Sequence, residues 1–172
     1  MNRMSEMNNT VCDCLAERLL KAFREKCFTF SAAESCTGGL TNARLTAIAG
    51  SSDVVLGGVV SYSNSVKEKV LGVRAETLSS YGAVSENTAA EMAEGVRRIT
   101  EASISVSITG VAGPGGGSKE KPVGTVCFGV ASDRGVRTET KYFESTLSRS
   151  EIRRLASDYA LTLALDEASC EV

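Results

Sequence analysis

The feature that most constrains the fold is the alternation of short β-branched runs with helical segments along the chain. The expected order is helix, strand, helix, strand, two short helical pieces and a longer helix, three strands and a closing helix. Helices placed between successive strands are typical of crossover connections, which make neighbouring strands parallel. We therefore expect an α/β fold: a three-layer α/β/α domain with a mixed, mainly parallel sheet and a C-terminal antiparallel hairpin. The expected helices cover residues 8–26, 40–48, 65–71, 74–80, 85–100 and 150–168, and the expected strands cover 27–32, 54–62, 104–108, 123–131 and 136–143.

Local signals support these segments. Val11, Leu15 and Leu19 recur at helical spacing in the first segment, which indicates an amphipathic helix. Ser85 is a plausible N-cap for the long middle helix. Asp133-Arg134-Gly135 separates the last two strands and is typical of a hairpin turn. In such sheets ligands gather at the carboxyl ends of strands, so we expect a crevice there.

Length and charge narrow the class of protein. A chain of 172 residues is most simply one domain with a substantial core. The net charge is −2, aromatic residues make up 5% and tryptophan is absent, so nucleic-acid binding is not indicated. Because no apolar run is long enough to span a bilayer, and the N-terminus is polar with Arg3 and Glu6, we expect no membrane association and a cytoplasmic location.

The cysteines and the missing histidine limit the chemistry. The chain has no histidine, and none of its six cysteines forms a C-x-x-C pair. A structural zinc site is therefore not expected, and we predict no metal. All cysteines except Cys36 are interpreted as reduced, small hydrophobic residues. The six are Cys12, Cys14, Cys27, Cys36, Cys127 and Cys170.

Residues 33–39 (AESCTGG) place two nucleophilic side chains at an expected strand-to-helix turn. Such a turn presents a nucleophile among backbone N–H groups. The absence of histidine excludes Ser-His-Asp and Cys-His schemes. Ser35 is favoured over Cys36, which has no imidazole to pair with. Thr37 is the more natural cap of the following helix, and Glu34 is a conceivable base without an evident partner carboxylate.

A serine without histidine requires another base, and lysine serves in known variants. Such a lysine must be neutral when it acts, which burial or nearby positive charge favours. Lys67 follows the second expected strand, and Tyr62 closes that strand. A phenol beside a lysine can relay the proton. The alternative is that both are ordinary surface residues near a strand end.

The glycine-rich stretch 110–118 has two interpretations. It is either a flexible connection or an anion-binding nest, in which Thr109 and Ser118 flank the glycines. It matches neither a Walker A loop nor a G-x-G-x-x-G turn. Arginines near the start of the last helix can clamp a phosphate: Arg149 is the most plausible ligand contact, Arg153 is a further candidate, and Arg154 is better explained as part of a solvated helix face.

Six ordered stretches resemble the CinA C-terminal domain family, whose active members are nicotinamide-nucleotide amidases. The resemblance runs in order over about residues 10 to 166, nearly the whole chain. Six ordered blocks are far more specific than one glycine pattern. Leu147-Ser148 replaces the usual Gly-Asp before the family's phosphate-contacting arginine, which falls on Arg149. The matching stretches are 33–39 (AESCTGG), 48–52 (IAGSS), 62–64 (YSN) with Lys67, 82–86 (GAVSE), 109–114 (TGVAGP) and 121–126 (KPVGTV).

The resemblance implies one amidohydrolase domain over residues 1–172, the stand-alone form of longer relatives. It implies hydrolysis of nicotinamide mononucleotide to nicotinate mononucleotide and ammonia, with Ser35, Lys67 and Tyr62 catalytic and no cofactor or metal. Lys67 would take the Ser35 proton directly or with Tyr62, and N–H groups near Cys36 to Gly38 would hold the oxyanion. The implied substrate-binding residues are Cys36, Thr37, Gly38, Asn64, Thr109, Gly110 and Arg149.

Two other functions stay open at this stage. The first is a nucleotide-binding or regulatory module without catalysis, which would not need Lys67 beside Ser35. The second, a DNA-associated competence factor, gains little from an acidic chain with few aromatic residues. The expected partner is a small nucleotide substrate, and we expect a homo-oligomer, with a dimer as the guess.

Overall fold

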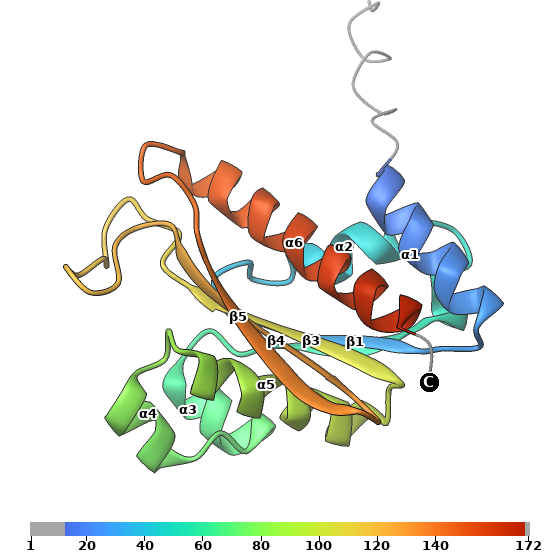
Figure 1. The fold of residues 1–172 in the computed structure, drawn as a ribbon, viewed down its shortest axis with the longest axis horizontal. Coiled ribbons are helices and arrows are strands. Elements are labelled where there is room, and N and C mark those ends of the chain that lie inside the picture. Colours follow the sequence, from blue (N-terminus) through green and yellow to red (C-terminus); the bar gives the residue numbers. More distant parts are fainter. Residues whose placement is uncertain (1–12, 171–172) are drawn as a thin grey trace, which may run out of the picture.

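The computed structural model describes residues 13–170, which form a five-stranded sheet between two helical layers. Helices α1, α2 and α6 lie on one face of the sheet, and α3, α4 and α5 lie on the other (Figure 1). The elements are α1 (Cys14–Glu25), β1 (Phe30–Glu34), α2 (Leu40–Thr46), the 3₁₀ turn η1 (Ser51–Asp53), β2 (Val55–Val60), α3 (Asn64–Val66), the π-helical turn η2 (Lys67–Leu71), α4 (Ala75–Tyr81), α5 (Glu86–Thr100), β3 (Ile104–Gly110), β4 (Thr125–Ser132), β5 (Gly135–Tyr142) and α6 (Arg149–Ser169).

The strand order is β2-β1-β3-β4-β5. Strand β1 pairs in parallel with both β2 and β3, whereas β4 pairs antiparallel with β3 and β5. The expected α/β fold is confirmed, including its mixed sheet and its C-terminal hairpin. None of the helices described between residues 13 and 170 is long and apolar enough to cross a membrane.

The first strand begins later than predicted. It starts at Phe30 rather than at residue 27 and continues to Glu34. Cys27 has a φ of 56°, and the Phe28 N–H donates to Phe23 O at 2.8 Å, so the chain is still turning out of α1 there. The apolar run from residue 27 is typical of a strand, but Phe28 packs edge-on against Phe23 instead of joining the ladder.

Two helix boundaries also differ. Helix α1 begins at Cys14 with Asp13 as its N-cap, and the expected start at residue 8, with Val11 and Cys12, lies outside the described residues. The short helix predicted for residues 65–71 is a turn of α-helix followed by the π-helical turn η2, which ends at Leu71 and is capped by Gly72 with a φ of 75°.

Strand β3 is buried on both faces, although its sequence alternates apolar residues with serine. The hydroxyls of Ser105 and Ser107 donate to the carbonyls of Ala93 and Ala89 in α5, at 2.8 and 2.5 Å. A Cβ added at Gly129 would lie only 2.5 Å from Ala89 O. Small residues thus let α5 approach the sheet closely, and the serines satisfy hydrogen bonds in that contact.

The alternation of β1 positions the site. Phe30 and Ala32 belong to the large apolar cluster beneath α1 and α6. Ala33 belongs to a smaller cluster on the α5 side, which also contains Ala33's neighbours Leu71 and Met92. Because successive side chains of a strand point to opposite faces, the strand delivers Glu34 to the α2 side and the residue that follows, Ser35, to the α5 side.

We predict that Gly95→Ala destabilises the fold. Alanine is preferred over glycine in a helix by about 1 kcal/mol, but a Cβ at Gly95 would lie 2.1 Å from Leu71 O. Overpacking of this kind costs about 1–3 kcal/mol, so the free energy of unfolding should fall. Urea unfolding measures it. Gly115→Ala is the control, because a Cβ there meets nothing within 4 Å. A Gly95→Ala protein as stable as the unmodified chain would contradict the close approach.

Candidate active site

Ser35 and Lys67 meet at the carboxyl end of β1. Lys67 Nζ lies 3.0 Å from Ser35 Oγ and donates a hydrogen bond to Ser61 O at 2.6 Å. Lys67 is only 1% exposed, whereas Ser35 is half-buried and can be reached from solvent. The structure therefore brings together the serine and the lysine that the sequence singled out.

The parallel ladder explains why these side chains meet. The Ser35 N–H donates to Ile108 O, and the Ser61 N–H donates to Glu34 O, both at 2.8 Å. These bonds extend β1 beside its two neighbours. Ser63 then caps α3 through its hydroxyl, and the chain folds back so that Lys67 lies beneath Ser61.

Burial shifts the pKa of the lysine. Desolvation disfavours the ammonium form and lowers the pKa of Lys67 below its usual range. Within residues 13–170, no carboxylate forms an ion pair with Lys67. A neutral amine has a lone pair that can take a proton from the adjacent hydroxyl, so Lys67 is suited to be a base.

Cys36 is a poor nucleophile in this setting. The side chain is 6% exposed, and burial raises the pKa of its thiol to about 12. Because the thiolate is the reactive form of cysteine, Cys36 stays a thiol at neutral pH. These properties favour Ser35 over Cys36 as a nucleophile.

The prediction that Thr37 caps helix α2 is wrong. The Thr37 hydroxyl is buried and has no hydrogen-bond partner among the described residues. The carboxylate of Glu34 caps the helix instead, accepting from the N–H groups of Gly39, Thr41 and Asn42 at 3.0, 3.1 and 2.9 Å. Glu34 is fully buried and faces away from Ser35, so its role is to hold the helix rather than to act as a base.

The backbone after Ser35 offers two N–H groups to a ligand. The Gly38 N–H closes the turn by donating to Ser35 O at 3.1 Å. The N–H groups of Cys36 and Thr37 donate to no other residue in the described part of the chain. The set of oxyanion donors expected from the sequence, Cys36 to Gly38, is thereby reduced to the first two.

Tyr62 lies near this site but does not contact Lys67 or Ser35 by a hydrogen bond. Its side chain is 63% exposed, and its hydroxyl accepts from Arg149 Nη2 at 2.8 Å. Arg149 Nη1 also donates to Gly113 O at 2.8 Å. Arg149 thus links Tyr62, just after β2, to the glycine-rich loop.

Four further residues were predicted to bind the substrate: Thr109 and Gly110 at the end of β3, Asn64 in α3, and Gly38. Thr109 donates to Ala83 O at 2.7 Å, and a Cβ at Gly110 would lie 2.7 Å from Thr125 O, so packing alone accounts for both. Asn64 begins α3 and is exposed, and Gly38 has a φ of 61° within the turn.

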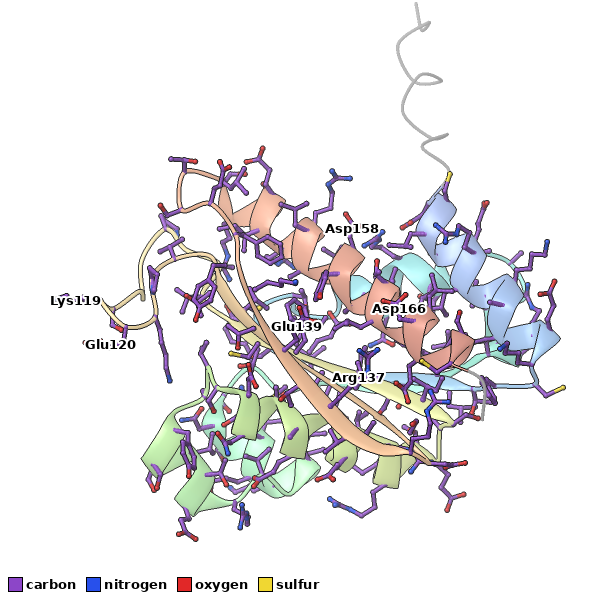
Figure 2. All side chains as sticks on the ribbon, in the orientation of Figure 1. Lys119, Glu120, Arg137, Glu139, Asp158 and Asp166 are labelled. Carbon is purple, nitrogen blue, oxygen red and sulfur yellow. The ribbon has the colours of Figure 1, made fainter. Side chains whose placement is uncertain are left out.

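The glycine-rich loop is only partly near the site. Gly113 contacts Arg149, but the Ser118 hydroxyl bonds to Glu120 within the loop. Figure 2 shows Lys119 and Glu120 at the loop's tip, away from the sheet. Ser118 therefore does not flank a common nest with Thr109.

Arg153 was predicted only as a further phosphate contact, whereas it contacts the turn that carries Ser35. Its Nη2 donates to Thr37 O at 2.6 Å, inside the turn that carries Ser35. Its spacing of four residues from Arg149 was the available signal, since such positions share a helix face.

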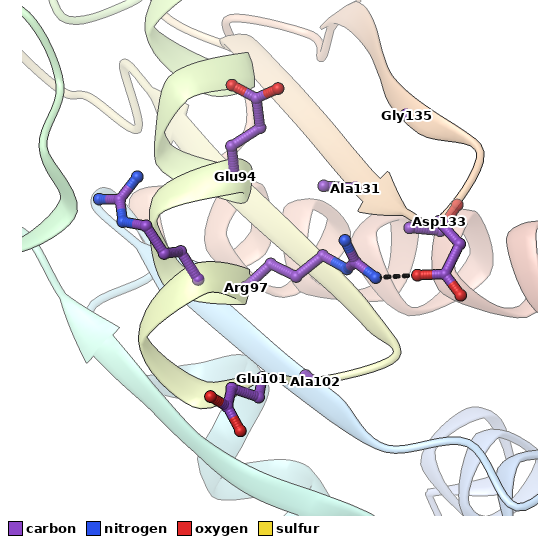
Figure 3. A pocket seen from close by; sticks show the side chains of 9 residues that line it. Glu94, Arg97, Glu101, Ala102, Ala131, Asp133 and Gly135 are labelled. Carbon is purple, nitrogen blue, oxygen red and sulfur yellow. Dashed lines mark hydrogen bonds and ion pairs between the residues drawn. The ribbon is translucent and has the colours of Figure 1, made fainter.

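A separate hollow of about 630 Å³ lies at the other end of the sheet, where the β4–β5 turn meets the end of α5 (Figure 3). An ion pair between Arg97 and Asp133 crosses it. Ser35 and Lys67 do not line it. Among residues 13–170, no group of three or more His, Cys, Asp or Glu side chains is placed to hold a metal ion.

Comparison with known proteins identifies the family of this chain. The model of the CinA C-terminal domain matches residues 13–168. The chain belongs to the CinA C-terminal domain family. A CinA-like protein of Desulforapulum autotrophicum is 59% identical over 62% of the chain, and one of Pseudothermotoga lettingae is 44% identical over 88%. The chain spans only 25% and 37% of the lengths of these two relatives.

Solved structures of the CinA superfamily share the fold. The competence/damage inducible protein CihA from Agrobacterium tumefaciens has a TM-score of 0.86 and 43% identity, covering 91% of this chain and 94% of that one. A CinA superfamily protein from Escherichia coli has a TM-score of 0.80 and 32% identity, covering 96% and 99%. The CinA fold therefore extends over nearly the whole chain.

We predict that Glu34→Gln loosens the junction between β1 and α2. Each carboxylate oxygen accepts two hydrogen bonds, from Gly39 and Thr41 on one side and from the N–H and Nδ2 of Asn42 on the other. The amide would turn one acceptor into a donor that faces other donors, which costs about 1–3 kcal/mol. Thermal unfolding measures the loss, and the exposed Glu68→Gln serves as the control. Equal stabilities for the two variants would refute the cap.

Proposed function

We propose that this chain hydrolyses the carboxamide of nicotinamide mononucleotide, giving nicotinate mononucleotide and ammonia. The observation that carries the proposal is the 3.0 Å contact between Ser35 Oγ and the buried Lys67 Nζ. The substrate class comes from the family resemblance in the ordered sequence blocks. The names of the relatives describe CinA-like and competence-damage proteins and give no substrate.

The reaction begins with proton transfer from Ser35 to neutral Lys67. Ser35 Oγ attacks the carboxamide carbon, and the negative charge that forms on the carbonyl oxygen is stabilised by the N–H groups of Cys36 and Thr37. The C–N bond then breaks, and the Lys67 ammonium returns its proton so that ammonia leaves. Water hydrolyses the resulting ester, with Lys67 as base, to release the carboxylate and restore the serine.

The surface around Arg149 suits an anionic substrate. Arg149 is exposed, and its guanidinium has donors left beyond those used on Tyr62 and Gly113. In this proposal Arg149 binds the substrate phosphate, and Tyr62 orients Arg149. Proton transfer is direct, since Tyr62 is bonded to Arg149 rather than to Lys67.

A binding module without catalysis is the competing function. Such a module has no need for a buried lysine beside a turn serine. Burial of an amine without a carboxylate partner costs free energy. A role as a base that must be neutral to act would explain why this lysine is buried. The Ser35–Lys67 geometry therefore favours the enzyme.

We predict that Ser35→Ala and Lys67→Met each reduce ammonia release from nicotinamide mononucleotide by at least about a thousandfold. Cys36→Ala should retain most of the activity, because its backbone N–H is unchanged. Lys69→Met is the control for Lys67→Met, since Lys69 is exposed on the same segment. An active Lys67→Met enzyme, or inactivation by Cys36→Ala alone, would refute the mechanism.

We predict that kcat/KM rises with pH, by about tenfold per unit at the acid end, and levels off above the lowered pKa of Lys67. The rise follows because only the neutral amine is a base. The same shift links pH to stability: between the folded and the unfolded pKa the unfolded state binds more protons, so stability increases with pH. Lys67→Met should remove this contribution from urea unfolding curves. A rate that falls with pH would contradict the assignment.

A further inference from the structure

The turn that carries Ser35, residues 35–38, is fixed by its backbone at both ends. The Ser35 N–H donates to Ile108 O at 2.8 Å, and the Gly38 N–H donates to Ser35 O at 3.1 Å. Among the described residues, one side chain from elsewhere donates to a carbonyl of this turn. It is Arg153, whose Nη2 lies 2.6 Å from Thr37 O.

The arginine controls the plane of one peptide group. Thr37 C=O and Gly38 N–H belong to the same planar unit, so this unit is held by Arg153 at its oxygen and by Ser35 O at its nitrogen. Gly38 has a φ of 61°, and glycine moves easily between backbone conformations. A Cβ at Gly38 would lie 3.6 Å from Arg153 Nη2, which shows how closely the guanidinium covers the turn.

The fixed peptide matters for the N–H groups beside it. Hydrogen bonds from a guanidinium to a carbonyl are charge-assisted and strong. With the Thr37 carbonyl held by Arg153, the chain before it cannot rotate freely, and the N–H groups of Cys36 and Thr37 keep one direction. These are the two N–H groups of the turn that donate to no other described residue.

The two arginines of α6 have different surroundings. Arg149 is exposed and donates hydrogen bonds to Tyr62 and to the carbonyl of Gly113. Arg153 is half-buried, one helical turn further along, and bonds to the turn itself. Arg154, the next residue, is exposed and lines a hollow beside α1 with Asp13 and Leu40.

We propose that Arg153 is a positioning residue that aligns Ser35 and its oxyanion donors, and that it does not bind the substrate phosphate. The proposal rests on the proposed function, in which Ser35 is the nucleophile of an amidase. It assigns different roles to two arginines of α6. Arg149 binds the substrate, and Arg153 holds the turn that carries Ser35 through Thr37 O.

The test compares a substrate that has the phosphate with one that lacks it. For R153M, R153K, R149M and R154M, kcat and KM are measured with nicotinamide mononucleotide and with nicotinamide riboside. R153M should lower kcat by about 10- to 100-fold on both substrates, as expected when catalytic groups are slightly misplaced, with KM nearly unchanged. R153K should recover much of the rate because its ammonium can still donate to Thr37 O. R149M should affect the mononucleotide alone, and R154M neither substrate.

Two results overturn the proposal. One is a loss by R153M that is confined to the mononucleotide, which would make Arg153 a phosphate ligand. The other is an unchanged kcat. Thermal unfolding checks the fold of each variant, and if R153M does not fold, R153Q is measured in its place and judged by the same two results.

A second readout separates this proposal from the proposed function. A fluorophosphonate reporter phosphonylates an activated serine, with loss of fluoride, and needs no amide substrate. If the unmodified chain releases no ammonia from either substrate, the proposed function fails. The labelling rate of Ser35 still tests Arg153: it should fall in R153M and stay unchanged in R154M, and equal rates in both overturn the positioning role.

Discussion

The buried carboxylate of Glu34 is the interaction on which the arrangement of the site depends. It ends β1 and holds the first turn of α2 through backbone N–H groups. Without it, three N–H groups at a buried helix start would have no partner. Because β1 alternates its side chains, fixing Glu34 on one face fixes Ser35 on the other. One residue therefore anchors a helix while its neighbour faces the lysine.

The sequence predicted the fold well because its signals were local and consistent. Crossover helices, the Asp133-Arg134 hairpin and the Ser85 cap each require only a few neighbouring residues. The boundaries at Phe30 and at Lys67 were missed because tertiary contacts decided them: Phe28 packs on Phe23, and Leu71 is pressed against Gly95. The π-helical turn has no clear signature in the residues themselves.

The candidate site was predictable in its chemistry more than in its contacts. Because the chain has no histidine, a lysine was the expected base for a serine nucleophile, and Lys67 was predicted to act on Ser35. Thr37 was the predicted cap because threonine is a common N-cap residue, whereas a glutamate six residues before the helix is not a usual signal. The contacts of Tyr62 with Arg149 and of Arg153 with Thr37 join residues 87 and 116 positions apart in the chain, and no local pattern encodes them.

The smaller apolar cluster on the α5 side has a consequence for how the protein opens. Lys67 and Leu71 lie in the same π-helical turn, and burial there lowers the pKa of the Lys67 amine. Local opening of the layer on the α5 side would hydrate the amine and favour its protonated form, and the charged ammonium resists being buried again. In the proposed mechanism, the proton that disables the base would thus also favour the opened layer. Catalytic competence would then depend on the closure of one helical layer.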